Sequence, residues 1–176
     1  MLKGERVLLR PMRREDIPTQ HEFNQDVGLH SLDSDPPHVS PVESAETFYV
    51  SRTKRDPNMA PLAIEADGKY IGYCTLMHLQ NPHGNLELGI MIGDHEFWGR
   101  GYGREVVQLL LEYGFHHLGA RRIALTTHAR NERAIRCFRA CGFVEEGRPR
   151  KVLWIEGAYT DLVNMSILRD EWQPAA

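Results

Sequence analysis

Asn85-Leu86-Glu87-Leu88-Gly89-Ile90-Met91-Ile92, followed by Trp98-Gly99-Arg100-Gly101-Tyr102-Gly103-Arg104, is the stretch that decides the fold of this chain. In its first part, aliphatic residues alternate with Glu87, Gly89 and Met91, which is the period of a strand with one buried face. Its second part has glycine at every second position, and a helix with an apolar stripe follows to about Leu118. We therefore predict a strand, a glycine-rich turn and a helix in succession.

The glycine-rich turn is a candidate anion site. Gly99, Gly101 and Gly103 permit close approach of a ligand to the backbone, and successive N–H groups then converge on one point. These N–H groups lie at the positive end of the helix that begins near Gly101, which favours phosphate or pyrophosphate. Arg100 and Arg104 would add positive charge there. A tight turn without a ligand explains an isolated glycine motif equally well.

Two common nucleotide-binding motifs do not fit the turn. The phosphate-binding pattern GxxxxGK[ST] is absent from the sequence. A dinucleotide-binding GxGxxG would need its third glycine at the position of Arg104, and an acidic residue about 20 positions on, where 120–122 is basic instead. We therefore expect neither a P-loop nor a dinucleotide site.

Composition indicates one globular domain spanning 1–176. The chain is 41% hydrophobic and 26% charged, and it is long enough to bury a core without the help of disulfides or metal ions. Lys plus Arg is 21 against 24 for Asp plus Glu, so the net charge of −3 gives no reason to expect nucleic-acid binding. The longest apolar run, 88–93, is far short of the ~20 residues that span a bilayer. We expect a soluble, cytoplasmic protein without a membrane partner.

Cysteine and histidine give no metal or disulfide signal. The three cysteines are odd in number and lack CxxC spacing, which argues against a disulfide framework and a zinc finger. The nine histidines include no HxxxH or HExxH pattern. We therefore predict no metal site.

The rest of the chain predicts an α+β fold. Before the central stretch we expect a strand at 6–9, a helix from Asp16 to about Asp26, a loop at 31–41, and a helix to about Lys54 that begins with the capping box Ser40-Pro41-Val42-Glu43. Strands at 61–66 and 70–79 meet at the hairpin signal Asp67-Gly68, and 85–93 completes an antiparallel meander.

After the central helix we expect a strand at 122–127, a helix capped by Asn131 with Gly142 at its end, and strands at 143–146, 152–155 and 159–168. Glu156-Gly157 turns the last hairpin. The prediction is a mixed, mostly antiparallel sheet of about seven strands with about four helices and one parallel crossover.

Taken together, the motifs resemble those of the GNAT superfamily of acetyl-CoA-dependent N-acetyltransferases, and of its ribosomal-protein and spermidine acetyltransferase branch. The resemblance covers nearly the whole chain in the right order and spacing. The residues that carry it are 6–11 with Glu15-Asp16, 85–92, 98–103, 131–138 with Gly142-Phe143, and Tyr159-Thr160-Asp161 with Met165, Glu171 and Trp172.

The resemblance implies a site for the cosubstrate acetyl-CoA. Backbone amides of the glycine-rich turn would hold its pyrophosphate, and the strand ending at Met91-Ile92 would pair with its pantetheine arm in a splayed gap beside the strand 122–127. Asn131 would bind near the pantetheine end, besides capping its helix. The implied cofactor-binding residues are Met91, Ile92, Gly99, Arg100, Gly101, Tyr102, Gly103, Arg104 and Asn131.

The resemblance also implies acetyl transfer to a primary amine by direct attack in a ternary complex. An alkyl amine is protonated near neutral pH and must lose a proton before it attacks a thioester. Glu87 lies on the strand face opposite the buried stripe, and its position in the family marks it as the base. A solvent-facing or substrate-binding carboxylate is the alternative role for Glu87.

Two residues depart from the superfamily pattern. Trp98 stands where many members have Gln or Arg, which leaves the backbone amides unaffected. Phe138 stands where many members have a tyrosine that protonates the departing thiolate. Tyr102, His128 and Tyr159 are possible substitutes, whereas a helix cysteine such as Cys137 more often serves packing.

The acceptor amine would lie between the N-terminal helices and the last hairpin. By analogy it is a protein N-terminus, a polyamine or an aminoglycoside, and acidic residues there would favour a cation. These residues, Glu22, Asp26, Asp33 and Asp35, fit a solvated surface equally well. A non-catalytic acyl-CoA-binding module and an interaction domain without CoA are the alternatives, and the choice between monomer and homodimer stays open.

Overall fold

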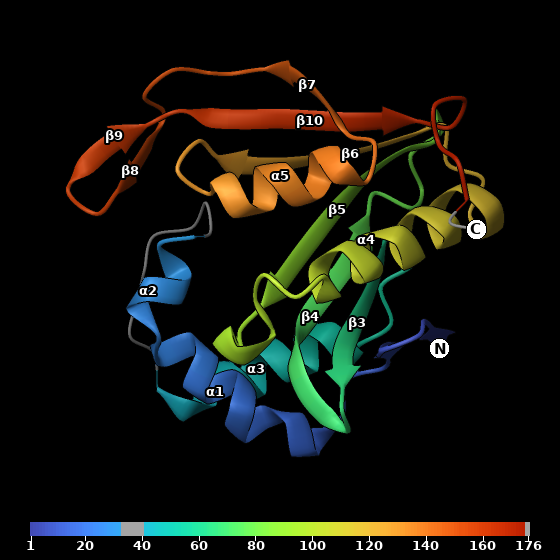
Figure 1. Ribbon diagram of the computed structural model, residues 1–176. Coiled ribbons are helices and arrows are strands. Elements are labelled where there is room, and N and C mark those ends of the chain that lie inside the picture. The colour runs from blue at the N-terminus through green and yellow to red at the C-terminus, as the bar shows by residue number, and fades with distance from the viewer. Residues whose placement is uncertain (33–40, 175–176) are drawn as a thin grey trace.

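The structure is a computed structural model that describes residues 1–32 and 41–174. Figure 1 shows a large curved sheet with helices on its faces and a separate hairpin, β8–β9. The strands are β1 Leu2–Lys3, β2 Val7–Arg10, β3 Met59–Ala66, β4 Lys69–Met77, β5 Asn85–Ile92, β6 Arg122–His128, β7 Val144–Gly147, β8 Leu153–Ile155, β9 Ala158–Thr160 and β10 Leu162–Leu168.

Helices are α1 Ile17–Gln25, α2 Val27–His30, α3 Val42–Thr53, α4 Tyr102–Glu112 and α5 Glu132–Ala140, with short 3-10 turns η1 Arg14–Asp16 and η2 His95–Phe97 and a π-helical turn η3 Tyr113–His117. The main sheet has eight strands in the order β1-β2-β3-β4-β5-β6-β10-β7. The predicted α+β class with a mixed, mostly antiparallel sheet is confirmed. The additional strands and helices are short elements, such as β1 and α2.

Opposite faces of β3 and β4 carry two different layers because neighbouring residues of a strand point to opposite sides. Ile64 and Ile71 belong to the main core, which includes the buried residues of α4. Ala63 and Tyr70 belong to a smaller cluster with Phe23 of α1 and with α3. In Figure 1, α4 and α3 accordingly lie on opposite faces of these strands. The α3 face is important below because side chains of β4 and β5 enter a cavity there.

The parallel crossover joins β5 to β6, as predicted, but their pairing is short. The register covers only Asn85 with Arg122, Leu86 with Ile123 and Glu87 with Ala124. Both strands continue beyond this point, β5 to Ile92 and β6 to His128. Their facing backbone edges therefore separate after Glu87, which produces the splayed gap that the family resemblance implies.

Some element boundaries differ from the predictions for local reasons. The central α-helix ends at Glu112 and continues as a π-helical turn, in which Gly114 packs so closely that a Cβ would lie 2.6 Å from Ile123 Cδ1. The predicted strand 159–168 is split at Asp161, whose side chain accepts a hydrogen bond from Lys151 N and whose carbonyl accepts one from Ala129 N. These contacts hold Asp161 outside both β9 and β10.

The start of α3 also differs. Pro41 occupies the N-cap position before α3 and not the first helical position, and the predicted cap Ser40 lies outside the described residues. Asp16 precedes α1 as predicted, but its side chain does not cap α1. Within residues 1–32 and 41–174, no helix is both long and apolar enough to cross a membrane.

Candidate active site

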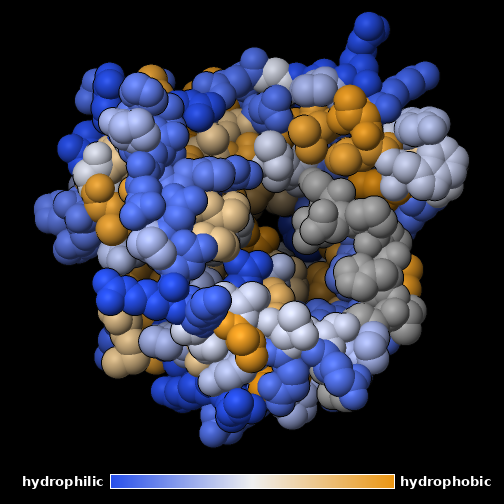
Figure 2. All heavy atoms as spheres, turned by 180° about the vertical axis from the view of Figure 1, so that it is seen from behind, coloured by the Kyte–Doolittle hydropathy of each residue, from blue (hydrophilic) through white to orange (hydrophobic). Residues whose placement is uncertain are grey.

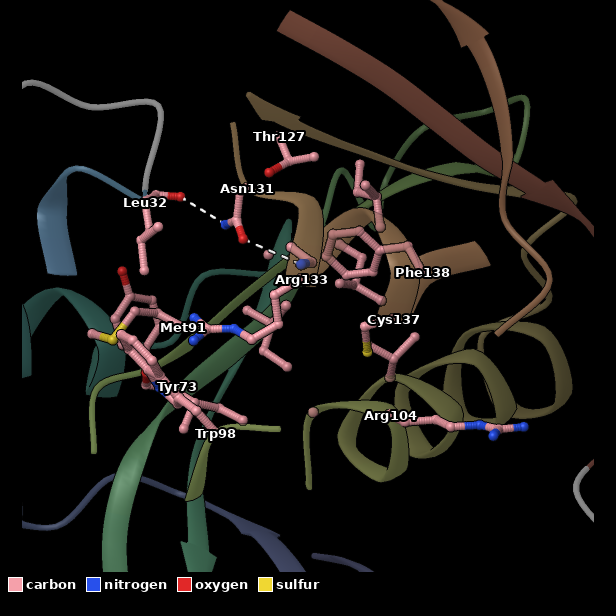
Figure 3. A pocket seen from close by; sticks show the side chains of 18 of the residues that line it. Leu32, Tyr73, Met91, Trp98, Arg104, Thr127, Asn131, Arg133, Cys137 and Phe138 are labelled. Carbon is pink, nitrogen blue, oxygen red and sulfur yellow. Dashed lines mark hydrogen bonds between the residues drawn. The ribbon is translucent and has the colours of Figure 1, made fainter. Parts of the chain in front are cut away.

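A cavity of about 630 Å³ lies where β5 and β6 separate. Its walls include Leu88–Ile92 from β5 and Leu125–Thr127 from β6, together with residues of α3, α5 and the glycine-rich turn. Figure 2 shows that the molecule is deeply hollowed on one face, and Figure 3 shows how the cavity residues are arranged. We call its lining by Gly99, Gly101, Gly103 and Arg104 the glycine side, and its lining by Arg52, Tyr73, Thr75, Met77 and Glu87 the α3 side.

The glycine side has the conformation that an anion site needs. Gly101 is the N-cap of α4 with a φ of 91°, a left-handed value that glycine adopts without strain. No side chain caps this helix, so its first N–H groups are available to a ligand. Gly99 has a φ of 71° and opens the turn.

Arg6 and Glu105 fix the glycine turn to the sheet. The Glu105 carboxylate accepts hydrogen bonds from Arg6 N at 2.8 Å, from Arg6 Nε at 3.1 Å and from Val7 N at 3.1 Å. Arg6 Nη1 donates to the carbonyl of Arg100 at 2.9 Å. The start of β2 therefore holds the turn in place before any ligand binds.

Most of the predicted cofactor residues line the cavity, but two do not. Tyr102 is buried against Phe97, with ring centroids 5.0 Å apart, because it anchors the first turn of α4 in the core. Arg100 is exposed and donates to the carbonyl of Glu96 at 3.1 Å. The predicted residues that do line the cavity are Met91, Ile92, Gly99, Gly101, Gly103, Arg104 and Asn131.

Asn131 caps α5 as predicted and also bridges the cavity. Its Oδ1 accepts from Ala134 N at 3.2 Å, and its Nδ2 donates to the carbonyl of Leu32 at 3.1 Å (Figure 3). The second hydrogen of Nδ2 remains for a ligand. Asn131 thus links α5 to the segment that follows α2.

On the α3 side, Glu87 is the one carboxylate among the described residues that line the cavity. Its side chain is 40% exposed, and His78 Nε2 lies 3.2 Å from its Oε2. Glu87 pairs with Met77 across the β4–β5 ladder, so it shares a sheet face with Tyr73, Thr75 and Met77. This places the carboxylate at the point where β5 leaves β6.

Arginines of α3 and α5 form a feature that the sequence did not reveal. Arg133 reaches from α5 across the cavity (Figure 3), and its guanidinium lies 3.6 Å from the centroid of the Trp98 ring. Burial lowers the pKa of Arg133. Arg52 of α3 lies 4.9 Å from the Phe48 ring centroid and 5.2 Å from that of Tyr73. Nothing in the sequence pattern indicates which of its many arginines face a cavity.

The acidic residues predicted to favour a cationic acceptor do not line the cavity where they are described. Glu22 is exposed. Asp26 caps α2 by accepting from Leu29 N at 2.9 Å, and it pairs with His95 at 3.0 Å. Asp33 and Asp35 lie outside the described residues.

Phe138 is buried and lines the cavity, with no proton to donate. None of its proposed substitutes, Tyr102, His128 and Tyr159, is among the described lining residues. Tyr159 is 64% exposed on the β8–β9 hairpin. Tyr73 is the tyrosine that lines the cavity, on a strand that the sequence analysis assigned to structure alone.

Cys137 and Cys141 form an interacting pair beside the glycine turn. A hydrogen bond from Cys141, opposed in part by burial, lowers the pKa of Cys137, with Arg104 and Arg133 adding to the effect. The same pairing raises the pKa of Cys141. Cys137 lines the cavity. No cluster of potential metal ligands occurs in the described parts of the chain.

Comparisons with known proteins place the chain in a family. Residues 6–144 match the family model described as "Acetyltransferase (GNAT) domain". Spermidine N(1)-acetyltransferase of Escherichia coli K12 is 26% identical over 98% of this chain and 91% of its own. A putative ribosomal N-acetyltransferase of Bacillus subtilis is 31% identical over 69% of this chain and 66% of its own.

Solved structures show the same fold with a ligand in place. The crystal structure of spermidine N-acetyltransferase from Vibrio cholerae in complex with CoA and spermine has a TM-score of 0.84 and 26% identity, and it covers 96% of this chain and 98% of its own. The glycine turn of this chain presents the uncapped N-terminus of α4, which favours a phosphate group. The chain therefore belongs to the GNAT acetyltransferase family and is an N-acetyltransferase, which transfers the acetyl group of acetyl-CoA to an amine.

Proposed function

We propose that the protein acetylates a primary alkyl amine on the α3 side of the cavity, with Glu87 accepting the proton of the amine. The observation that carries this proposal is the position of Glu87 at the last residue pair between β5 and β6, inside the cavity. A carboxylate at this point reaches an amine directly or through one water as it attacks the thioester.

The glycine side is proposed to hold the cofactor. The uncapped N-terminus of α4 would bind the pyrophosphate, and the β5 edge at Met91-Ile92 would pair with the pantetheine arm. The carbonyl of Ile92 also accepts a hydrogen bond from Trp98 Nε1 at 2.8 Å, which ties the end of β5 to the glycine turn. Asn131 would donate its remaining N–H from the opposite wall.

His78 would support Glu87 as a positioning residue. Its contact of 3.2 Å with Oε2 of Glu87 would fix one carboxylate oxygen and leave the other for the amine. Because both side chains are partly exposed, the proton taken from the amine can pass to solvent. Phe138 supplies no proton, so the departing thiolate would take one from water or from Tyr73.

An amine panel tests this proposal. Spermidine, short peptides with free N-termini and an aminoglycoside follow from the names of the relatives and from the open choice of acceptor. We expect amine-dependent release of the CoA thiol and a product heavier by one acetyl group. Glu87→Gln should lower kcat/KM by roughly 100-fold or more while CoA affinity stays constant, because general-base catalysis typically contributes 10²–10⁴-fold.

Glu43→Gln is the matched control, because Glu43 is exposed on α3 and does not line the cavity. Equal activity of Glu87→Gln and Glu43→Gln would exclude Glu87 as the base. CoA binding by the wild type without transfer to any member of the panel would count against alkyl amines as the acceptor class.

A further inference from the structure

Among the described residues, the cavity lining holds more arginines than carboxylates, and one of these arginines, Arg52, lies on the α3 side. Four arginines contribute to the lining of the cavity, Arg52, Arg104, Arg133 and Arg136, against the single carboxylate residue Glu87 among the described residues. Arg104 lies on the glycine side, and its guanidinium points away from the cavity (Figure 3). Arg136 pairs with Glu132 at 3.3 Å on the surface. Neither Arg52 nor Arg133 has an ion pair with a described carboxylate.

Arg52 is held in place by rings and not by a carboxylate. Its guanidinium stacks on Phe48 and Tyr73 at 4.9 and 5.2 Å from their centroids. Among residues 1–32 and 41–174, no carboxylate lies within 4.0 Å of it. Its Nε is buried and has no hydrogen-bond partner there. A buried donor without an acceptor is costly, so the hydrogen bonding of this guanidinium is incomplete among the described residues.

Arg10 shows how a buried arginine of this chain is paired, and Arg52 lacks such carboxylate partners among the described residues. Arg10 is buried and donates to both carboxylate oxygens of Asp16 at 2.8 Å and to Glu65 at 2.5 Å. Arg52 presents the same forked donor to a cavity. The planar guanidinium matches a carboxylate or phosphate with two parallel hydrogen bonds.

The stacking of Arg52 on Tyr73 of β4 also sets how far it lies from Glu87. Tyr73, on which it stacks, and Met77, which pairs with Glu87, are four residues apart on one face of β4. At about 3.3 Å per residue, the two backbone positions are roughly 13 Å apart. An extended acceptor with its amine at Glu87 can therefore place its far end beside Arg52.

We propose that Arg52 makes this enzyme selective for amines that carry an anionic group at the far end of an extended chain, such as a carboxylate several bonds from the amine. This inference rests on the proposed function, because it takes Glu87 as the place of the amine. It favours an amino acid derivative or an acidic peptide over a polyamine, whose second cation would face Arg52 and Arg133. At short range, opposite and like charges in a partly buried site differ by large factors in affinity.

Three amines of one length test the inference: 8-aminooctanoate, n-octylamine and 1,8-diaminooctane. They present an anion, a methyl group and a cation to Arg52. We expect kcat/KM to fall in that order, by about tenfold at each step. An aminoalkyl phosphate of the same length distinguishes a phosphate preference from a carboxylate preference.

Variants of Arg52 then assign the preference to this side chain. Arg52→Gln should bring the three values together, and Arg52→Glu should reverse their order. Arg55→Glu, at an exposed position that does not line the cavity, makes the same charge change nearby and should keep the wild-type order. A purely structural role of Arg52 would lower all three values by one factor and leave their ratios unchanged.

Two results would overturn the inference: a wild-type preference for the diamine, or ratios that Arg52→Glu leaves unchanged. CoA affinity and the melting temperature of each variant identify any that fails to fold, in which case Arg52→Gln carries the test. If the wild type acetylates none of the amines, the proposed function fails separately. Calorimetric binding of the three amines to the CoA complex then decides the selectivity of Arg52, with the same order expected.

Discussion

The glycine side of the cavity is built from backbone supplied by one short stretch of chain, whereas the α3 side is built from side chains that distant segments bring together. Gly99, Gly101 and Gly103 act through their conformation and their N–H groups. Arg52, Tyr73 and Glu87 come from α3, β4 and β5. A site made of backbone changes little between relatives that share the fold. A site made of side chains can differ from one relative to the next.

We therefore expect specificity for the acceptor to lie on the α3 side. On the proposed assignment, the cofactor that the family shares would be bound by a turn and a helix terminus. The acceptor is recognised by charge and shape, which change with single substitutions.

The largest effect should come from the buried ion pair that joins Arg10 of β2 to Asp16, the residue before α1. Arg10 and Asp16 are each about 4% exposed, and Asp16 also accepts from Arg13 N at 2.7 Å. Asp16→Ala leaves the Arg10 charge buried without this partner, so the free energy of unfolding should fall by about 3–5 kcal/mol. Urea unfolding measures it. Glu46→Ala, which removes the exposed pair with Arg14, should cost less than about 1 kcal/mol, and equal losses would contradict the account.

The same pair should make stability depend on pH. Burial raises the pKa of Asp16, but hydrogen bonds from Arg10 and from the backbone of Arg13 outweigh it, so the net shift is downward. A carboxyl with a lowered folded-state pKa stabilises the protein above its unfolded pKa, and this stabilisation is lost as pH falls through the folded pKa. The stability difference between wild type and Asp16→Asn should therefore shrink on acidification. A difference that is constant with pH would refute the assignment.

A smaller effect should distinguish Gly101 in the glycine turn from Gly119, a left-handed glycine outside the cavity. Gly101 and Gly119 have φ values of 91° and 71°. Replacement of either by alanine should cost about 1–2 kcal/mol of unfolding free energy. A Cβ at Gly101 would also lie 3.0 Å from Arg6 Nη2, whereas one at Gly119 would meet nothing within 4 Å. Only Gly101→Ala should weaken CoA binding by calorimetry, and equal affinities would show that the turn does not hold the cofactor.

The smallest effect concerns thiol reactivity on the glycine side. Because the Cys141 hydrogen bond lowers the pKa of Cys137, and burial raises the pKa of Cys74, Cys137 should be alkylated first near neutral pH. Saturating CoA should slow this labelling several-fold, as mass spectrometry of digested peptides can measure. Labelling at a rate independent of CoA would place the cofactor away from Cys137.

Sequence patterns predicted the glycine side well because its parts are local. The alternation of 85–92, the glycine cluster and the cap Asn131 each follow from short-range rules, and the structure has β5, α4 and α5 there. Tyr102 shows the limit of such rules, because a residue inside the motif is turned into the core by its packing against Phe97. Arg100 likewise lies beside the motif without lining the cavity.

The α3 side was harder to predict because its residues meet only through tertiary structure. Glu87 was identified from strand parity and family position, and its exposure to the cavity agrees with both. Arg52 and Arg133 are ordinary helix arginines in the sequence, and only their stacking on Tyr73 and Trp98 distinguishes them. Asp26, in contrast, was expected to face a cationic acceptor, but it is occupied by the cap of α2 and by His95.

The central claim is that the two sides have separate tasks, cofactor binding and proton removal from the amine. Single-turnover acetyl transfer from enzyme loaded with acetyl-CoA tests it most directly, with wild type and Glu87→Gln compared at equal occupancy by calorimetry. We predict unchanged CoA affinity and transfer slowed by roughly 100-fold or more in the variant. Equal transfer rates, or a loss of CoA affinity that accounts for the slower rate, would contradict the account.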